Sequence, residues 1–317
     1  MSGDTTLPVV TPEYCEALWR EVCNWRRWGG DDQRGTLNLI DEAKRLRAAS
    51  LVQQGMVLGM GNPWPVDPGP HNAWPAEHRM IRAGDDCDYP GVPGLSVAMD
   101  YIGVQHHGIA CSHVDALCHV FVKHQMYNGY PASDVKSTGA LKNDMQPMQD
   151  GVVTRGVLLD IPRLRQRDYL AGNDRISKED LSAAANAQNL AVEPGDVLIV
   201  HKGRQNRVVA EGLFDPVGAG MPGLHPECAS WLHDKDVAML GSDYMNDPQP
   251  NWDCDRWPIP IHYLGICGMG MALLHNLDTE AVARHCESLG RWEFLLTIAP
   301  LKIPGATGSP ANPIAMF

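Results

Sequence analysis

The feature of this sequence that most constrains its fold is a run of prolines between residues 61 and 94. Seven prolines stand in this stretch, at positions 63, 65, 68, 70, 75, 90 and 93. Proline removes a backbone hydrogen-bond donor and breaks regular elements, so we expect no helix or strand here. A loop this long in a compact domain is usually functional or disordered. Because it also carries two tryptophans and two histidines, we expect an ordered lid or an oligomer arm, with simple disorder as the alternative.

The rest of the chain mixes strand-like and helix-like segments without a regular strand–helix–strand repeat. A doubly wound parallel sheet is therefore not expected, and no glycine-rich nucleotide loop is present. We find no linker, so we expect one domain over residues 1–317, with a helical N-terminal segment at about 12–54. The patterns predict helices at 12–28, 41–54, 177–188, 226–232 and 265–274, strands at 56–60, 95–104, 152–161, 197–200, 237–240 and 292–298, and a coil from residue 300.

Composition excludes several classes of partner. The formal charge of −12 argues against nucleic acids and anionic membranes, which require basic patches. No run of eighteen apolar residues is present, so no transmembrane helix is expected. Residues 1–6 lack the basic start and apolar core of a signal peptide. The nine cysteines form no CxxC pair, and we expect reduced thiols in a cytoplasmic protein.

Chemistry is concentrated between residues 106 and 119, where four of the fourteen residues are histidines. Its centre is His113-x-Asp115-x-x-x-His119. Residues two apart in an extended segment project to the same side, so His113 and Asp115 could reach one point. Imidazole nitrogen and carboxylate oxygen are common ligands of zinc and manganese. We interpret the cluster as a metal site with His119 as an adjacent acid/base; the alternative is a polar loop.

Such a metal needs further ligands from elsewhere in the chain. The candidates are His262, after an apolar segment, and His275, between leucine and asparagine. The two histidines are thirteen positions apart, which is enough for a helix to carry their side chains to opposite walls of one cavity. A lone histidine beside apolar residues is more often structural than a ligand, so both readings stay open here.

The segment Ser112–His119 resembles the [Thr/Ser]-His-x-Asp-Ala-x-x-His signature of the cyclase-like metal-dependent hydrolases, the superfamily of bacterial kynurenine formamidase and isatin hydrolase. Other pieces resemble the same family in the same order, and together they cover most of the chain. They lie at residues 27–38, 152–160, 194–198, 222–227, 241–243 and 299–303. The resemblance implies an α/β (α+β) protein with a swivelling β/β/α fold, in which a mixed sheet forms a barrel-like core with peripheral helices.

The resemblance also implies roles for individual residues. His113, Asp115 and His262 would be metal ligands, His119 the acid/base, and His275 would stand where the formamidase branch has a glutamate ligand. One position departs from the family, because its first ligand histidine is Ile109 here. His107, two residues earlier, could replace that ligand or face the substrate. With that ligand missing, we expect a single Zn²⁺ or Mn²⁺ per chain.

The reaction implied is hydrolysis of an amide, such as an aryl formamide or a cyclic amide, or of a lactone, by metal-activated water. The substrate would be a small carbonyl compound with a ring, held in a pocket for which the candidates are His107, Trp64, Trp74 and Tyr127. A lyase or dehydratase on the same metal and an inactive metal-binding scaffold are the alternatives. The Pro/Trp-rich stretch and the family's habit both predict a homo-oligomer, either a dimer or a tetramer.

Overall fold

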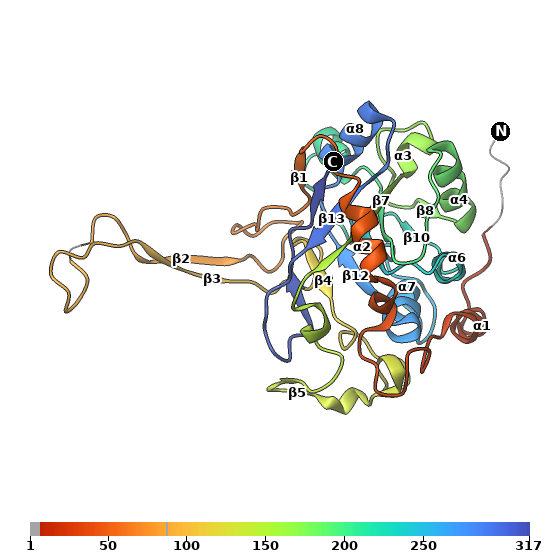
Figure 1. Cartoon of the computed structure of the whole chain (residues 1–317), viewed down its shortest axis with the longest axis horizontal. Coiled ribbons are helices and arrows are strands. Elements are labelled where there is room, and N and C mark those ends of the chain that lie inside the picture. The colour runs from red at the N-terminus through yellow and green to blue at the C-terminus, as the bar shows by residue number, and fades with distance from the viewer. Residues whose placement is uncertain (1–6, 87) are drawn as a thin grey trace.

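The structure, a computed structural model, describes residues 7–86 and 88–317. The segment in which the sequence lacks a signal-peptide pattern, residues 1–6, lies outside the described residues. A curled sheet of nine strands forms the centre of the molecule, and helices cover it (Figure 1). Along the sheet the order is β1 (Val57–Gly59), β15 (Ile314–Met316), β13 (Glu293–Ile298), β7 (Val152–Asp160), β9 (Val197–His201), β11 (Met239–Ser242), β12 (Ala272–His275), β4 (His113–Asp115) and β14 (Gly308–Pro310).

The middle of this sheet is parallel and its two flanks are antiparallel. Strands β7, β9, β11 and β12 pair in parallel, and the remaining pairs in the sheet are antiparallel. Parallel neighbours need crossover connections, and helices supply them, so the middle of the chain alternates strand and helix more than the sequence pattern indicated. The helices are α1 (Pro12–Val22), α2 (Glu42–Ala49), α3 (Ile161–Leu164), α4 (Lys178–Ala187), α5 (Arg204–Glu211), α6 (Cys228–Asp234), α7 (Pro260–His262), the π-helical η5 (Tyr263–Met269) and α8 (Glu280–Leu289).

Both faces of the sheet are buried, as a parallel sheet requires. Side chains that alternate along β7 and β9 separate into two apolar clusters, with Leu159 and Leu198 in one and Leu158 and Ile199 in the other. Shorter pieces complete the fold. These are the strands β5 (Val135–Lys136), β6 (Gly139–Ala140), β8 (Arg175–Ile176) and β10 (Gly223–Leu224), and the 3₁₀ turns η1 (Gly35–Leu39), η2 (Tyr127–Gly129), η3 (Ala132–Asp134) and η4 (Gln146–Met148).

Local signals placed several elements correctly. Asp41 accepts a hydrogen bond from the backbone nitrogen of Lys44 and caps α2, and Ser177 forms a capping box with Asp180 at the start of α4. Strands β7, β9 and β13 lie within a residue or so of their predicted ranges. The mixed, curled sheet with peripheral helices is the architecture that the family resemblance implied.

Two predictions about the C-terminal half were wrong. The segment predicted as one helix at 265–274 is the end of η5 followed by strand β12, because Gly270 adopts a left-handed conformation (φ 70°) that ends the helical turn. The tail predicted as a coil contains β14 and β15, which pair with β4, β13 and β1. These pairings join segments far apart in the sequence, which local composition does not indicate.

The proline-rich stretch also holds a strand, contrary to prediction. No proline stands between Pro75 and Pro90, and that interval contains β2 (Glu77–Arg82), which pairs antiparallel with β3 (Met99–Gly103). We call residues 77–103, that is β2, β3 and their connection, the arm. The arm extends away from the rest of the molecule (Figure 1). The prolines lie outside its two strands, so they interrupt the chain without preventing the hairpin. None of the helices in the described part of the chain is long and apolar enough to cross a membrane.

Candidate metal centre

The alternation of side chains along a β-strand places the first two candidate ligands, His113 and Asp115. In β4, His113 and Asp115 project to the same side, while Val114 between them is fully buried in the apolar core. Strand β12 pairs with β4 so that His275 lies directly opposite His113. The strand pairing therefore brings one histidine from far along the chain beside the His-x-Asp motif.

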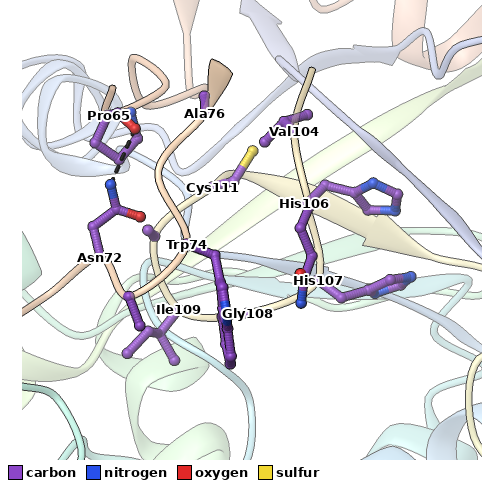
Figure 2. A pocket seen from close by; sticks show the side chains of 13 residues that line it. Pro65, Asn72, Trp74, Ala76, Val104, His106, His107, Gly108, Ile109 and Cys111 are labelled. Carbon is purple, nitrogen blue, oxygen red and sulfur yellow. Dashed lines mark hydrogen bonds between the residues drawn. The ribbon is translucent and has the colours of Figure 1, made fainter. Parts of the chain in front are cut away.

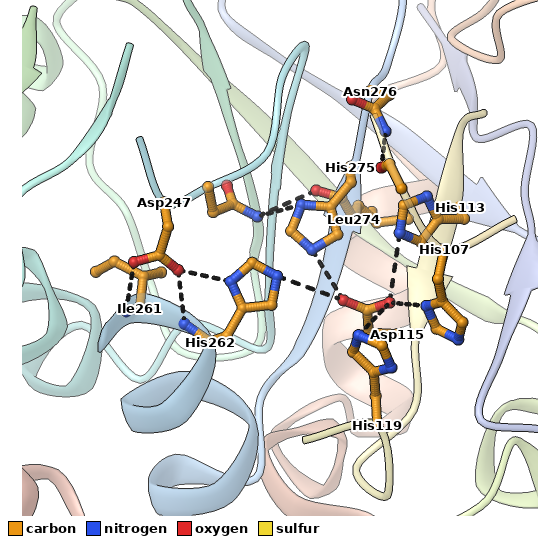
Figure 3. A network of polar contacts seen from close by, with 12 residues as sticks. His107, His113, Asp115, His119, Asp247, Ile261, His262, Leu274, His275 and Asn276 are labelled. Carbon is orange, nitrogen blue, oxygen red and sulfur yellow. Dashed lines mark hydrogen bonds and ion pairs between the residues drawn. The ribbon is translucent and has the colours of Figure 1, made fainter. Parts of the chain in front are cut away.

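Asp115 lies at the centre of a ring of imidazoles (Figure 3). Its Oδ1 is 2.9 Å from Nδ1 of His107 and 3.4 Å from Nε2 of His113. Its Oδ2 is 2.9 Å from Nε2 of His275 and 3.8 Å from Nε2 of His262. Two ligand atoms of one tetrahedral zinc, each about 2.0–2.1 Å from it, lie roughly 3.3 Å apart. The four distances fall around that value, so the donor atoms fit a divalent metal.

These residues form two potential ligand groups that share the carboxylate. One consists of Asp115, His262 and His275, all buried, and the other of His107, His113 and Asp115. Oδ1 of Asp115 and Nδ1 of His107 are buried without a hydrogen-bond partner although they are close, because the pair is not aligned for a hydrogen bond. Buried polar atoms without partners are rare in proteins, and a cation bound between these two atoms would satisfy both of them.

Hydrogen bonds on the outer ring nitrogens orient the histidines. Nδ1 of His262 lies 2.6 Å from Oδ2 of Asp247, whose carboxylate also accepts the backbone N–H groups of Ile261 and His262. This contact leaves Nε2 of His262 free to face Asp115. His113 and His107 are oriented in the same way. Nδ1 of His113 lies 2.8 Å from the carbonyl oxygen of Cys111, and Nε2 of His107 lies 3.0 Å from Oγ1 of Thr307. Such outer partners fix which nitrogen is offered to a metal.

Burial and charge set the protonation of the centre. Burial by itself would raise the pKa of Asp115, but His119, His275 and their neighbours hold that pKa well below its usual value. Burial lowers the pKa of His275 to about 3. For His262 burial also acts to lower the pKa, and the bond to Asp247 outweighs it and raises the pKa. An ionised carboxylate beside a neutral imidazole is the form in which both groups bind metals.

His119 lies beside the two ligand groups and belongs to neither. Its ring stacks on His107 with a centroid distance of 3.9 Å and an interplanar angle of 5°. Its Nε2 is 3.9 Å from Oδ1 of Asp115, and 26% of its side chain is exposed. Burial lowers the pKa of His119 to about 4, although Asp115 acts in the opposite direction. It is thus more accessible than the buried ligand candidates while still facing the same carboxylate.

The four residues predicted to line the substrate pocket do not all lie in one pocket. Trp74 and His107 line one pocket, of about 430 Å³ of empty space, together with His106, Ile109 and residues before and after the arm (Figure 2). Trp64 is half-buried and does not line it. Tyr127 is fully buried and its hydroxyl donates to Oδ2 of Asp32 at 3.0 Å. That hydrogen bond and its burial make Tyr127 a core residue and not a wall of this pocket.

Two details of the ligand geometry differ from what the spacing indicated. His262 and His275 were expected on opposite walls, but their rings stack in parallel with centroids 4.8 Å apart, because a strand and not a helix carries His275. The family resemblance implied a ligand histidine at the position of Ile109, and His107, two residues earlier, lies in one of the two potential ligand groups. Gly108, which follows His107, has a φ of 146°, a conformation that glycine adopts more readily than other residues.

Asp247 is the residue that the sequence did not single out. It lies fifteen residues before His262 in the chain and follows no motif, so only the folded loop shows that it holds this ring. The same is true of Thr307, which lies two hundred residues from His107. Asp247 precedes a proline and Thr307 precedes a glycine, and neither short pattern indicates a contact with a distant histidine.

Comparison with known proteins agrees with this architecture. The family model Cyclase, described as "Putative cyclase", matches residues 46–247, which is more than half of the chain. A solved structure described as a novel cyclase is 30% identical, with a TM-score of 0.83, and the match covers 94% of this chain and 99% of that one. An isatin hydrolase bound to the product analogue thioisatinate shares the fold at 17% identity and a TM-score of 0.57, covering 87% of this chain and 98% of that one. Isatin hydrolase A from Ralstonia solanacearum is similar at 19% identity and a TM-score of 0.57, covering 87% and 97%. No curated protein matches the chain.

Proposed function

The chain belongs to the cyclase family, and on that premise we propose that it is a metal-dependent hydrolase that opens an amide or lactone bond. The observation that carries the proposal is the buried Asp115 carboxylate, whose two oxygens face four imidazole nitrogens at distances of 2.9 to 3.8 Å. A carboxylate surrounded in this way is costly to bury unless a cation or protons compensate the site. Zn²⁺ or Mn²⁺ suits this set of nitrogen and oxygen donors.

The ligand positions are proposed from the two groups that share Asp115. The group of Asp115, His262 and His275 is buried throughout, so we assign it the tighter position. The group of His107, His113 and Asp115 offers a second position. If both positions are filled, the chain holds two ions, one more than the sequence predicted. A divalent ion bound there would activate a water molecule and polarise the carbonyl group of a substrate.

We assign proton transfer to His119. Its ring reaches the same carboxylate as the ligands do, at 3.9 Å, and lies outside both ligand groups. A histidine placed in this way can take a proton from the attacking water and return it to the leaving nitrogen or oxygen. The stacking on His107 holds the ring in place without using its nitrogens.

The pocket lined by residues that precede and follow the arm supports a substrate that carries a ring. The indole of Trp74 lies in the wall that also contains Ile109 and His107 (Figure 2). An aromatic side chain provides a flat apolar surface on which a ring can stack. We therefore propose an aryl formamide, a cyclic amide or an aromatic lactone as the class of substrate.

Metal analysis and a substrate panel test the proposal. The chain, purified without chelator, should contain zinc or manganese and should turn over at least one member of a panel of aryl formamides, cyclic amides and lactones. In ¹⁸O-labelled water the product carboxylate should carry the label, whereas a lyase or dehydratase would leave it unlabelled. Asp115→Ala, which removes the one side chain shared by both potential ligand groups, should lose metal and turnover together. A protein that binds no divalent metal, or one that binds it and acts on no member of the panel, contradicts the proposal.

A further inference from the structure

The segment between the ligand candidates His107 and His113 is held in place by side chains. Residues 108–112, which the structure describes in full and which we call the linking loop, form no helix or strand. Its carbonyl oxygens at positions 108, 109 and 111 accept hydrogen bonds from two side chains, Asn276 and Arg204. Backbone groups outside helices and sheets need partners of this kind or water, so these two side chains determine where the loop lies.

Asn276 contacts both ends of the linking loop. Its Nδ2 donates to the carbonyl oxygens of Gly108 at 2.8 Å and of Cys111 at 3.1 Å. The oxygen of Cys111 also lies 2.8 Å from Nδ1 of His113, so the amide and the ligand ring share one acceptor. Asn276 is fully buried, follows His275 directly in the chain and lies near His113 (Figure 3). One amide therefore connects the end of β12 with the loop before β4.

The backbone of Asn276 is bonded to the same region. Its carbonyl oxygen accepts hydrogen bonds from Oγ of Ser112 at 2.5 Å and from Nδ2 of Asn62 at 2.6 Å. Its φ is 54°, in the left-handed region that asparagine enters more readily than most other residues. The chain thus turns at Asn276 so that both its side chain and its carbonyl group face the linking loop.

Arg204 determines which way the amide of Asn276 points. Its Nη1 donates to Oδ1 of Asn276 at 3.2 Å, which leaves the amide nitrogen to face the loop, and its Nη2 donates to the carbonyl oxygen of Ile109 at 3.0 Å. Nη1 also lies 3.3 Å from the carbonyl oxygen of Asp243, and the guanidinium lies over the ring of Tyr244. The rigid fork of an arginine holds several acceptors in fixed directions at once.

Stability alone does not explain an arginine at position 204. The residue is partly buried, and burial lowers the pKa of Arg204. Its three side-chain hydrogen bonds go to neutral oxygens and none goes to a carboxylate. Replacing a buried charge by an apolar side chain of similar volume is often neutral or stabilising. The contacts to Ile109 and Asn276 are therefore the features that an apolar residue could not supply.

The ligand group of Asp115, His262 and His275 does not depend on the linking loop. Strand β12 carries His275, and Asp247 orients His262. His107 lies outside any strand, and the linking loop connects it to β4. Movement of the loop would therefore displace His107 and leave His262 and His275 in place.

We propose that Arg204 and Asn276 are positioning residues of the metal centre, which hold the linking loop so that the ring of His107 faces Asp115. The proposal rests on the proposed function, because it treats the group of His107, His113 and Asp115 as a metal position. Without the two side chains the loop is free to move, and ordering it around an ion costs conformational entropy. Metal affinity at that position should fall roughly 10- to 100-fold, the usual effect of changing groups that orient ligands.

Two variants remove the contacts and spare the backbone. Arg204→Met keeps an unbranched side chain and loses every donor, and Asn276→Gly keeps a residue that accepts a φ of 54°. The matched controls are Arg207→Met and Asn128→Gly. Arg207 is also on α5 and donates to two backbone carbonyl groups, and Asn128 has a φ of 63° and donates to three. The controls lose the same kinds of contact, but neither side chain touches the linking loop.

The mobility of the loop is measured on protein stripped of metal. Ile109 is the one isoleucine of the linking loop, so its δ1 methyl group in ¹³C-methyl-labelled protein reports on this loop. Its NMR order parameter should fall in Arg204→Met and Asn276→Gly and should stay native in both controls. An unchanged order parameter in the two variants overturns the proposal, whether or not the chain binds metal.

Chelator competition with Zn²⁺ then tests whether the two residues act through His107. His107→Ala identifies the Zn²⁺ affinity that depends on this ring, and Arg204→Met and Asn276→Gly should each lower that affinity roughly 10- to 100-fold. In a His107→Ala background they should change nothing further, because changes that act through one contact are not additive. Equal losses in both backgrounds, or losses in the controls, indicate a general structural effect and overturn the proposal. A native chain that binds no Zn²⁺ contradicts the proposed function instead, and the order parameter of Ile109 still decides whether the two side chains hold the loop.

Discussion

Two histidine–aspartate pairs of almost the same length stand in the arm and in the metal centre. In the arm, Nε2 of His78 lies 3.0 Å from Oδ2 of Asp100, and the two side chains are 48% and 49% exposed. In the centre, Nε2 of His275 lies 2.9 Å from Oδ2 of Asp115, and both side chains are 1% exposed. Water screens the first pair, so such a contact contributes about 0–1 kcal/mol. The second is dehydrated, and its cost must be offset by further groups.

The surroundings of the two pairs differ accordingly. The centre lies between strands that pair over long sequence distances, and its ligand rings are held by groups such as Asp247 and Thr307. The arm is a local hairpin with solvent on both faces. The pairing of distant strands within one chain therefore places the groups of the centre, whereas no described residue of the arm is buried. The predictions below test this difference, beginning with the largest effect.

The largest effect is expected from Asp115→Asn. The amide has nearly the same shape but removes the charge that faces four imidazoles, so metal content should fall close to zero and hydrolysis to background. Asp100→Asn, the same change in the arm pair, is the matched control and should leave the metal content of the chain unchanged. Metal analysis by mass spectrometry makes the measurement. Full occupancy in Asp115→Asn would remove this carboxylate from the ligand set.

His119→Ala should have the next largest effect and should act on rate alone. Loss of a general acid/base lowers kcat by roughly 10² to 10⁴, while KM changes far less because the group acts in the transition state. Metal content should stay at the native level. His233→Ala is a close control, since His233 is 27% exposed and lies 3.9 Å from Asp234, as His119 is 26% exposed and 3.9 Å from Asp115. If metal and rate disappear together in His119→Ala, His119 is a ligand.

Asp247→Asn should weaken metal binding without abolishing it. The amide can no longer offer two acceptor oxygens to the backbone and to Nδ1 of His262, so that ring loses its fixed orientation. Changes of such outer partners typically cost roughly 10- to 100-fold in metal affinity or activity. Competition with a chromophoric chelator measures the affinity. Asp255→Asn, at a side chain that is 85% exposed, should leave it unchanged, and an unaltered affinity in Asp247→Asn would show that the bond orients nothing that the metal needs.

The sequence predicted the parts of the centre that depend on local periodicity. His113 and Asp115 follow from the two-residue repeat of a strand, and β4 has that conformation. The capping box of α4 likewise needs only four consecutive residues. The parts that it did not predict depend on pairing between distant segments. Strands β14 and β15 in the tail are short and become strands only through their partners in the sheet.

The arm shows why proline content alone misleads. Prolines exclude regular structure where they stand, but β2 lies wholly between Pro75 and Pro90. Its partner β3 begins seventeen residues after β2 ends. No short turn motif joins the two strands, so the sequence contains no local pattern that indicates a hairpin. The sequence predicted an ordered lid or an oligomer arm in this stretch. Residues 77–103 form a hairpin that extends from the molecule (Figure 1), and the oligomer itself stays a prediction. Both tryptophans of the stretch, Trp64 and Trp74, precede this hairpin.

The smallest effect is expected from His78→Ala, and it tests the comparison from the side of the arm. Both members of the His78–Asp100 pair lie in water, with side chains 48% and 49% exposed, so breaking the pair should lower the free energy of unfolding by about 0–1 kcal/mol. Added salt should reduce the difference further, because it screens exposed charges. Urea denaturation of the chain with and without His78→Ala gives this value. A loss well above 1 kcal/mol would show that the pair is not screened by water, and the contrast between the two regions would no longer hold.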